Sequence, residues 1–191
     1  MAATVDPAAP VDAIPHRFGY AYQPDLLTVC NYIPVHSLVF RRLPGGARFD
    51  PALPALEDWD MWLRLTGRHG FRLRHVPEPT VIYHRVPDQT SMTGDASTQA
   101  AAFNRFGDLL RTLWRRWPPA SPKAGRFRAY LGVLYWQTLA HLATARPVSP
   151  CYYERCVRAL FDAWTGAAPE DGLIERLAAT VEEDTDAPDP Q

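Results

Sequence analysis

The sequence has few cysteines, no long apolar run and almost no net charge, and each of these absences excludes a class of protein. Cys30, Cys151 and Cys156 do not form an even set, and the spacing of the last two is not that of a zinc knuckle, so reduced thiols are expected. No apolar run reaches the roughly 20 residues that a membrane-spanning helix needs. The first residues, "MAATVDPAAPVDAIPH", have no basic segment followed by an apolar one, so no signal peptide is expected. A formal net charge of −1 gives no electrostatic reason to expect nucleic acid as a partner.

The composition is that of a soluble globular protein, and we expect it in the cytoplasm. Hydrophobic residues make up 47% and charged residues 21% of the 191 residues, which suits one domain, or one domain with an appendage. The 19 prolines cluster at both ends and between segments, where they mark boundaries. Four regions follow: a disordered Ala/Pro-rich tail at 1–24, a mixed region at 25–95, a helical region at 96–182 and an acidic disordered tail at 183–191.

Alternating or β-branched residues predict three short strands in the mixed region. The segments are "VHSLVFRRL" at 35–43, "FRLRHVP" at 71–77 and "TVIYHRV" at 80–86. Between the first two, the pattern becomes helical from Asp58 to about His69, because Trp59, Trp62 and Leu65 recur three residues apart.

Apolar residues at helical spacing dominate the rest of the chain. They predict four helices within residues 101–117, 127–144, 152–166 and 172–183. The sequence therefore predicts an α/β region followed by an α-helical one.

Three carboxylates, Glu57, Asp58 and Asp60, open the predicted helix near residue 58. An Asp-x-Asp metal site is disfavoured, because on a helix Asp58 and Asp60 point about 200° apart. A second interpretation is an acidic first turn that stabilises the helix dipole. A third is a catalytic base. Asp60 and Arg64, four residues apart, predict an ion pair on the helix surface.

Residues 31–91 resemble the C-terminal half of the GT-A domain in family-2 inverting glycosyltransferases. The resemblance runs through "NYIPVHSLVFRR", "FDPAL", "EDWDMWLRL" and "VPEPTVIYHR", in that order. It implies a partial GT-A-like (Rossmann-like) half domain at 25–95, in an α/β class, followed by the helical region. It also implies transfer of a sugar from a nucleotide-sugar donor to an acceptor hydroxyl with inversion.

The resemblance assigns roles to particular residues of this sequence. Asp58 of the "ED" pair becomes the general base that takes the proton of the acceptor hydroxyl, with Glu57 beside it shaping the site. Trp59 is a candidate for stacking on the acceptor sugar, with core packing as the alternative. Asn31 is a candidate for the acceptor or nucleotide cleft, and His84 and Arg85 for the leaving diphosphate; turn and surface roles are their alternatives.

Only the acceptor half of the family domain is represented in the sequence. Residues 1–30 contain no βα unit and no apolar strand leading to paired aspartates, so the nucleotide-binding half is expected to be lost or carried by a separate complementary chain. A divalent cation, Mn or Mg, is expected for the complete family enzyme, but no residue of this chain is assigned to it. The alternative function is a non-catalytic binding module derived from a glycosyltransferase.

A basic and aromatic stretch at 111–128, "RTLWRRWPPASPKAGRFR", suggests a possible membrane partner. Such a stretch can lie on the anionic inner surface of a membrane, where lipid-linked acceptors are found. The alternative is the solvated basic face of a packed helix.

Overall fold

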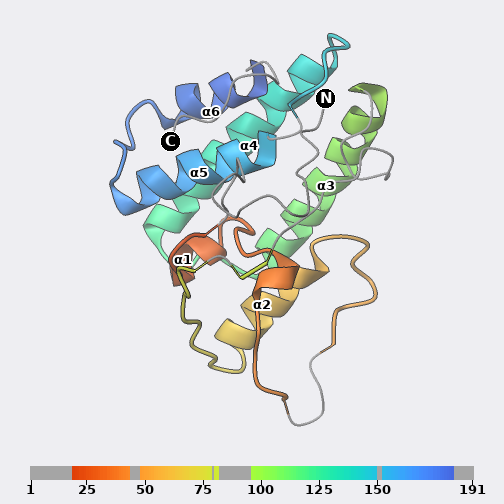
Figure 1. Ribbon diagram of the computed structural model, residues 1–191. Helices are drawn as coiled ribbons and strands as arrows, with labels where there is room; N and C mark the ends of the chain where they lie inside the picture. The colour runs from red at the N-terminus through yellow and green to blue at the C-terminus, as the bar shows by residue number, and fades with distance from the viewer. Residues whose placement is uncertain (1–18, 44–47, 79, 82–95, 150–151, 183–191) are drawn as a thin grey trace, which may run out of the picture.

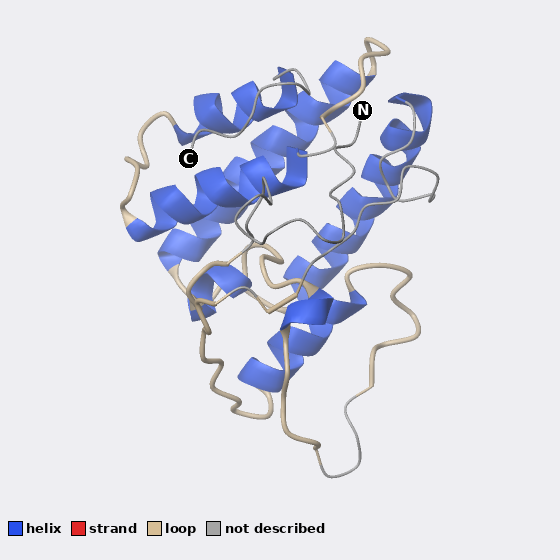
Figure 2. Cartoon of the chain, viewed as in Figure 1, coloured by secondary structure: helices blue, strands red, loops and turns tan. Residues whose placement is uncertain are grey.

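The computed structural model describes residues 19–43, 48–78, 80–81, 96–149 and 152–182. All regular elements in these ranges are helices (Figure 1 and Figure 2). They are α1 (Pro24–Leu27), the 3-10 helix η2 (Val35–Ser37), α2 (Glu57–Gly67), α3 (Ala96–Arg116), α4 (Pro122–Leu142), α5 (Tyr152–Thr165) and α6 (Leu173–Glu182).

The predicted α/β class is wrong, because no β-strand occurs in the described ranges. Segment 35–43 begins with η2 and continues as irregular chain, and segment 71–77 has no regular structure. Of segment 80–86, only residues 80–81 are described. Alternation of apolar residues is a local signal, whereas a strand also needs a neighbour for its backbone hydrogen bonds. In segment 35–43, for example, Val39 is 97% exposed whereas Leu38 and Phe40 pack against the core, and within the described residues no neighbouring strand pairs with it to form a Rossmann-like half sheet.

The helices expected at the C-terminal end of the chain are present. Helix α4 begins where Ser121 accepts a hydrogen bond at 3.3 Å from the backbone N–H of Ala124, and Pro122 occupies the first turn. A serine N-cap followed by proline is a strong start signal for a helix. The helical spacing of apolar residues, from which the four helices were predicted, therefore corresponds to a buried face on each helix.

Helix α6 packs against both α4 and α5, and α3 runs along α4 toward the N-terminal elements (Figure 1). The core joins Leu113, Phe127, Leu160 and Leu177, each at most 1% exposed. Between α3 and α4, a Cβ on Gly107 would lie 2.6 Å from the Tyr135 hydroxyl oxygen. This spacing leaves no room for a larger residue unless Tyr135 moves.

The guanidinium of Arg128 joins the segment after α1 to α3 and α4. Its Nε donates to the carbonyl of Thr28 at 3.0 Å and its Nη1 to that of Trp114 at 3.1 Å, while Nη2 donates to Thr28 and Trp117. Burial lowers the pKa of Arg128 to about 10, so the group is still charged at neutral pH. The indole of Trp114 donates to the carbonyl of Val29 at 3.0 Å. These bonds fix α1 and the following chain against the helical bundle.

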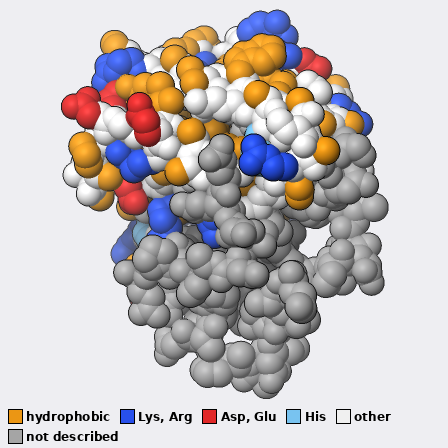
Figure 3. All heavy atoms as spheres, turned by 90° about the horizontal axis from the view of Figure 1, so that it is seen from above, with side chains coloured by type: hydrophobic (Ala, Val, Ile, Leu, Met, Phe, Trp, Pro, Cys, Tyr) orange, Lys and Arg blue, Asp and Glu red, His pale blue; other side chains and the backbone are white. Residues whose placement is uncertain are grey.

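Some side chains of the basic and aromatic stretch at 111–128 contact other parts of the protein, whereas Arg111 and Arg115 are exposed. Besides Trp114 and Arg128, Arg126 pairs with Glu170 at 3.1 Å, and Lys123 donates to the carbonyl of Trp164 at 2.7 Å. On the face seen from above the bundle, basic, acidic and apolar side chains are interspersed (Figure 3). Within the described residues, no helix combines the length and the apolar character required to cross a membrane.

Candidate functional site

The acidic turn at the start of α2 lies within the helix, as its sequence predicted. Leu56 precedes the helix in the left-handed conformation (φ 61°), and no side chain caps this end. Asp58 Oδ1 instead accepts a hydrogen bond at 2.7 Å from the backbone N–H of Trp59. A carboxylate at this end of a helix is stabilised by the free N–H groups and by the helix dipole. The turn therefore holds the Asp58 carboxylate in a defined orientation.

Asn31 and Asp58, 27 residues apart in sequence, meet in the structure. The Asn31 Nδ2 amide donates to Asp58 Oδ2 at 3.0 Å. Asp58 is partly buried, and this burial raises its pKa above the ordinary value of 3.8, although the bonds from Asn31 and Trp59 act in the opposite direction. The negative charge of Glu57 also raises the pKa of Asp58. A carboxylate with a raised pKa is a better proton acceptor than an ordinary one.

Tyr153, at the start of α5, completes the surroundings of this pair. Its hydroxyl donates to the backbone carbonyl of Asn31. The residue as a whole is 41% exposed, although its hydroxyl contacts the Asn31 carbonyl. Burial of the hydroxyl, followed by the proximity of Cys30 and then of Asp58, raises the pKa of Tyr153 well above 10.0. No pattern in the sequence links Tyr153 to this site, because it lies 122 residues beyond Asn31.

The two tryptophans of α2 are part of the core. Trp59 and Trp62 are 1% and 2% exposed. Their indole N–H groups donate to the carbonyls of Leu27 at 2.7 Å and Ile33 at 3.0 Å. Trp59 therefore packs α2 against α1, as the core-packing alternative for this residue predicted. Because its ring is buried, it presents no face on which a sugar could stack.

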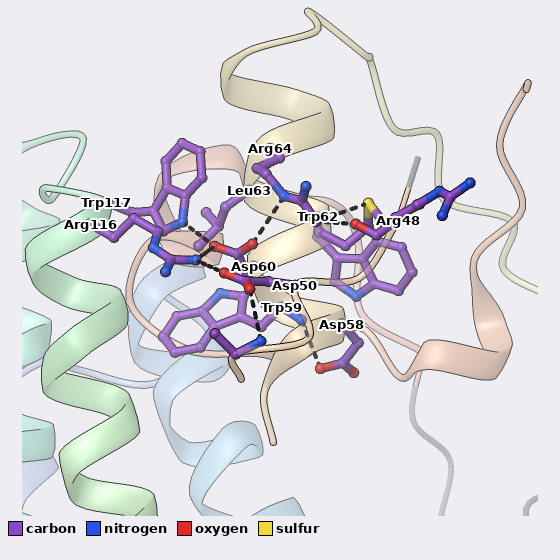
Figure 4. A network of polar contacts seen from close by, with 12 residues as sticks. Arg48, Asp50, Asp58, Trp59, Asp60, Trp62, Leu63, Arg64, Arg116 and Trp117 are labelled. Atoms are coloured by element: carbon purple, nitrogen blue, oxygen red, sulfur yellow. Dashed lines mark hydrogen bonds and ion pairs between the residues drawn. The ribbon is translucent and has the colours of Figure 1, made fainter. Parts of the chain in front are cut away.

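Asp60 belongs to a different cluster from Asp58 (Figure 4). The predicted ion pair with Arg64 is present at 3.0 Å. The prediction that it lies on the helix surface was wrong, because Asp60 is 0% exposed. Its Oδ1 also accepts from Arg116 Nη1 and from the Trp117 indole, both at 2.9 Å. The carboxylate thus joins α2 to the end of α3.

The divalent cation expected for the complete family enzyme does not fit the described residues. Asp58 is held by an amide, and Asp60 is neutralised by two arginines. Within the described part of the chain, no three His, Cys, Asp or Glu side chains are grouped so that they could hold a metal ion. His84 and Arg85 lie outside the described residues. The structure therefore brings together Asn31, Glu57 and Asp58 among the predicted site residues, and adds Tyr153.

Comparisons with known proteins give this chain no relative: no protein-family model, no curated protein and no solved structure matches it.

Proposed function

We propose that this chain supplies the acceptor side and the general base of an inverting glycosyltransferase, with Asp58 as the base. The observation that supports this proposal is the environment of Asp58: a partly buried carboxylate with a raised pKa, held by the Asn31 amide at the start of a helix. The "EDWDMWLRL" pattern supports it from the sequence. The proposal depends on this site and this pattern, and not on a Rossmann-like sheet.

The proposed reaction is a single displacement at the anomeric carbon of a nucleotide sugar. The acceptor oxygen forms a bond to this carbon from the side opposite the leaving group, and the bond from carbon to the diphosphate oxygen breaks. The proton of the acceptor hydroxyl passes to Asp58. Each Asp58 oxygen accepts one hydrogen bond from the protein and has a further lone pair for this proton. A positioned base contributes about 10²–10⁴-fold to such a step.

Asn31 and Glu57 act on the base and do not touch the reacting atoms in this proposal. Asn31 orients the carboxylate, and Glu57 raises the pKa of Asp58 through its charge. The acceptor is a glycan or lipid-linked hydroxyl on the cytoplasmic side of a membrane. The nucleotide and any divalent ion are bound by a complementary half carried by another chain.

The test is a transfer assay on the full chain, mixed with cell extract that supplies a complementary half. Labelled uridine and guanosine diphosphate sugars serve as donors, in the presence of manganese. We expect Asp58→Asn to lower turnover on the order of 10²–10⁴-fold and to leave the circular dichroism spectrum unchanged. Asp108→Asn, a change of the same kind at an exposed position on α3, should keep full turnover.

The outcomes separate the enzyme from the alternative of a binding module. Transfer that depends on added chain and is lost in Asp58→Asn supports the enzyme. Equal transfer by the wild type and Asp58→Asn contradicts the role of Asp58. Sugar binding that is detected by NMR, without transfer and unaffected by Asp58→Asn, supports the binding module.

A further inference from the structure

A hollow of about 410 Å³ lies between the loop at 48–51, α2 and the end of α3. Its lining includes four arginines and two aspartates: Arg48, Arg64, Arg68, Arg116, Asp50 and Asp60. The volume is within the range of about 300–1,000 Å³ that small-molecule sites occupy. This feature is separate from the Asp58 site, because Asp58 and Asp60 point to different sides of the first turn of α2 (Figure 4).

The lining has more positive than negative charge. Asp60 is fully buried and contacts Arg64 and Arg116. Asp50 pairs with Arg116 at 2.9 Å. The hydrogen bond from the Ala52 backbone N–H and then this pairing hold the pKa of Asp50 below its ordinary value. The four guanidinium groups of the lining outnumber its two carboxylates, so two positive charges in the hollow have no carboxylate to match them.

Several N–H groups of these arginines remain available. Arg116 uses the same nitrogen, Nη1, for both aspartates, and a guanidinium has five N–H donors in total. Arg68 stacks on the Trp117 ring at 4.9 Å, and among the described residues no acceptor is found for its N–H groups. Arg48 extends away from the two carboxylates (Figure 4). The two aspartates thus position Arg64 and Arg116 without saturating the basic side of the hollow.

We propose that this hollow is an anion site that binds a phosphate or pyrophosphate group. A doubly charged phosphate oxyanion matches the two uncompensated positive charges, and its oxygens suit the fork of N–H donors on a guanidinium. The ring of Trp117 holds the Arg68 guanidinium in one orientation, which lowers the entropy lost on binding. The inference goes beyond the proposed transfer reaction and does not require it.

Isothermal titration of the full chain with sodium pyrophosphate, at low ionic strength, tests the site. We expect a dissociation constant below about 1 mM. Arg68→Gln should weaken binding about 10-fold, because a charge-assisted hydrogen bond is lost. Arg48→Gln should weaken it less, about threefold, since its side chain extends away from the two carboxylates around which the other guanidinium groups gather. The control is Arg72→Gln, which removes the same charge from an exposed position outside the hollow and should leave binding unchanged within twofold.

A phosphate group can belong to a soluble molecule or to a lipid headgroup, and a second arm separates these sources. Co-sedimentation with phosphatidic acid vesicles, using neutral phosphatidylcholine vesicles as the reference, reports the lipid source. Loss of co-sedimentation in Arg68→Gln but not in Arg72→Gln supports a headgroup, and pyrophosphate binding without co-sedimentation supports a soluble ligand. The proposal is overturned if neither probe binds, or if Arg72→Gln weakens binding as much as Arg68→Gln does.

Discussion

Asp58 and Asp60 lie in the same turn of α2 but have different electrostatic surroundings. Asp60 is fully buried, and Arg64 and Arg116 lie within 3.0 Å of its oxygens. Asp58 is only partly buried and is held by an amide and a backbone N–H, with no cation paired to it among the described residues. A buried carboxylate that is neutralised by arginines joins structural elements. One that lacks a cation, and whose pKa is raised, remains able to accept a proton.

The two faces of α2 also differ in the elements that they contact. The Asp60 face meets the end of α3 through Arg116 and Trp117. The Asp58 face meets Asn31, which follows α1, and through its carbonyl Tyr153 of α5. The first face is therefore expected to respond to mutation with a loss of stability, and the second with a change in proton affinity.

Asp60→Asn should give the largest change in stability. The substitution keeps the shape of the side chain but leaves Arg64 and Arg116 without their common counter-charge. We expect it to lower the free energy of unfolding by on the order of 3 kcal/mol, the scale seen when one partner of a buried ion pair is removed. Urea denaturation followed by circular dichroism measures this change.

The matched control for this experiment is Asp108→Asn. Asp108 is paired with Arg111, but its side chain is 73% exposed, so the midpoint of unfolding should not move measurably. If Asp60→Asn leaves the midpoint as unchanged as Asp108→Asn does, Asp60 does not join α2 to α3 in the way described here.

Asn31→Ala should have a smaller effect that concerns proton affinity. The bond from the Asn31 amide lowers the pKa of Asp58, so its removal should raise that pKa further above 3.8. Stability should change by about 1 kcal/mol, as for the loss of one hydrogen bond. NMR titration of the Asp58 carboxyl carbon measures the pKa. Asn104→Ala, which removes an exposed amide on α3, should leave the titration of Asp58 unchanged; an equal shift in both variants would contradict the direct effect of Asn31.

The sequence predicted the helices well because their signal is repeated over several turns. The spacing in 101–117 and 152–166 is sustained over three turns or more, and α2 was placed to within two residues at each end. Segments 35–43 and 71–77 carry only one or two alternations, and nothing in a local pattern shows whether a neighbouring strand exists.

The site could be predicted only where a known pattern linked distant residues. The resemblance to a glycosyltransferase named both Asn31 and Asp58, which are in contact in the structure. Arg116 and Tyr153 were missed because their partners, Asp60 and Asn31, lie 56 and 122 residues away. No periodicity within one helix encodes such contacts, and the charge of Arg116 alone fits an exposed residue equally well.

The smallest effect expected is a difference in how stability depends on pH. Burial raises the pKa of Asp58 above 3.8 in the folded chain, so the folded state binds more protons than the unfolded state between these two values. The contribution of Asp58 to stability is then greatest below 3.8 and falls as the pH rises through the raised pKa. Asp58→Asn removes this contribution. The free energy of unfolding of the wild type minus that of Asp58→Asn should therefore decrease as the pH rises from about 3.5 to about 6.5.

Glu170 provides an internal control of the opposite sign. Arg126 lowers the pKa of Glu170 below 4.5, so its contribution is present above 4.5 and is lost as the pH falls through the lowered pKa. The difference in free energy of unfolding between the wild type and Glu170→Gln should therefore increase over the lower part of the same pH range.

Thermal or urea melts of the three proteins at matched pH values give both differences. Slopes of opposite sign would support the distinction between a carboxylate that is buried without a cation and one that is paired with an arginine. A flat or rising difference for Asp58→Asn would show that Asp58 is not destabilised in its charged form, and the case for a tuned base would then fail.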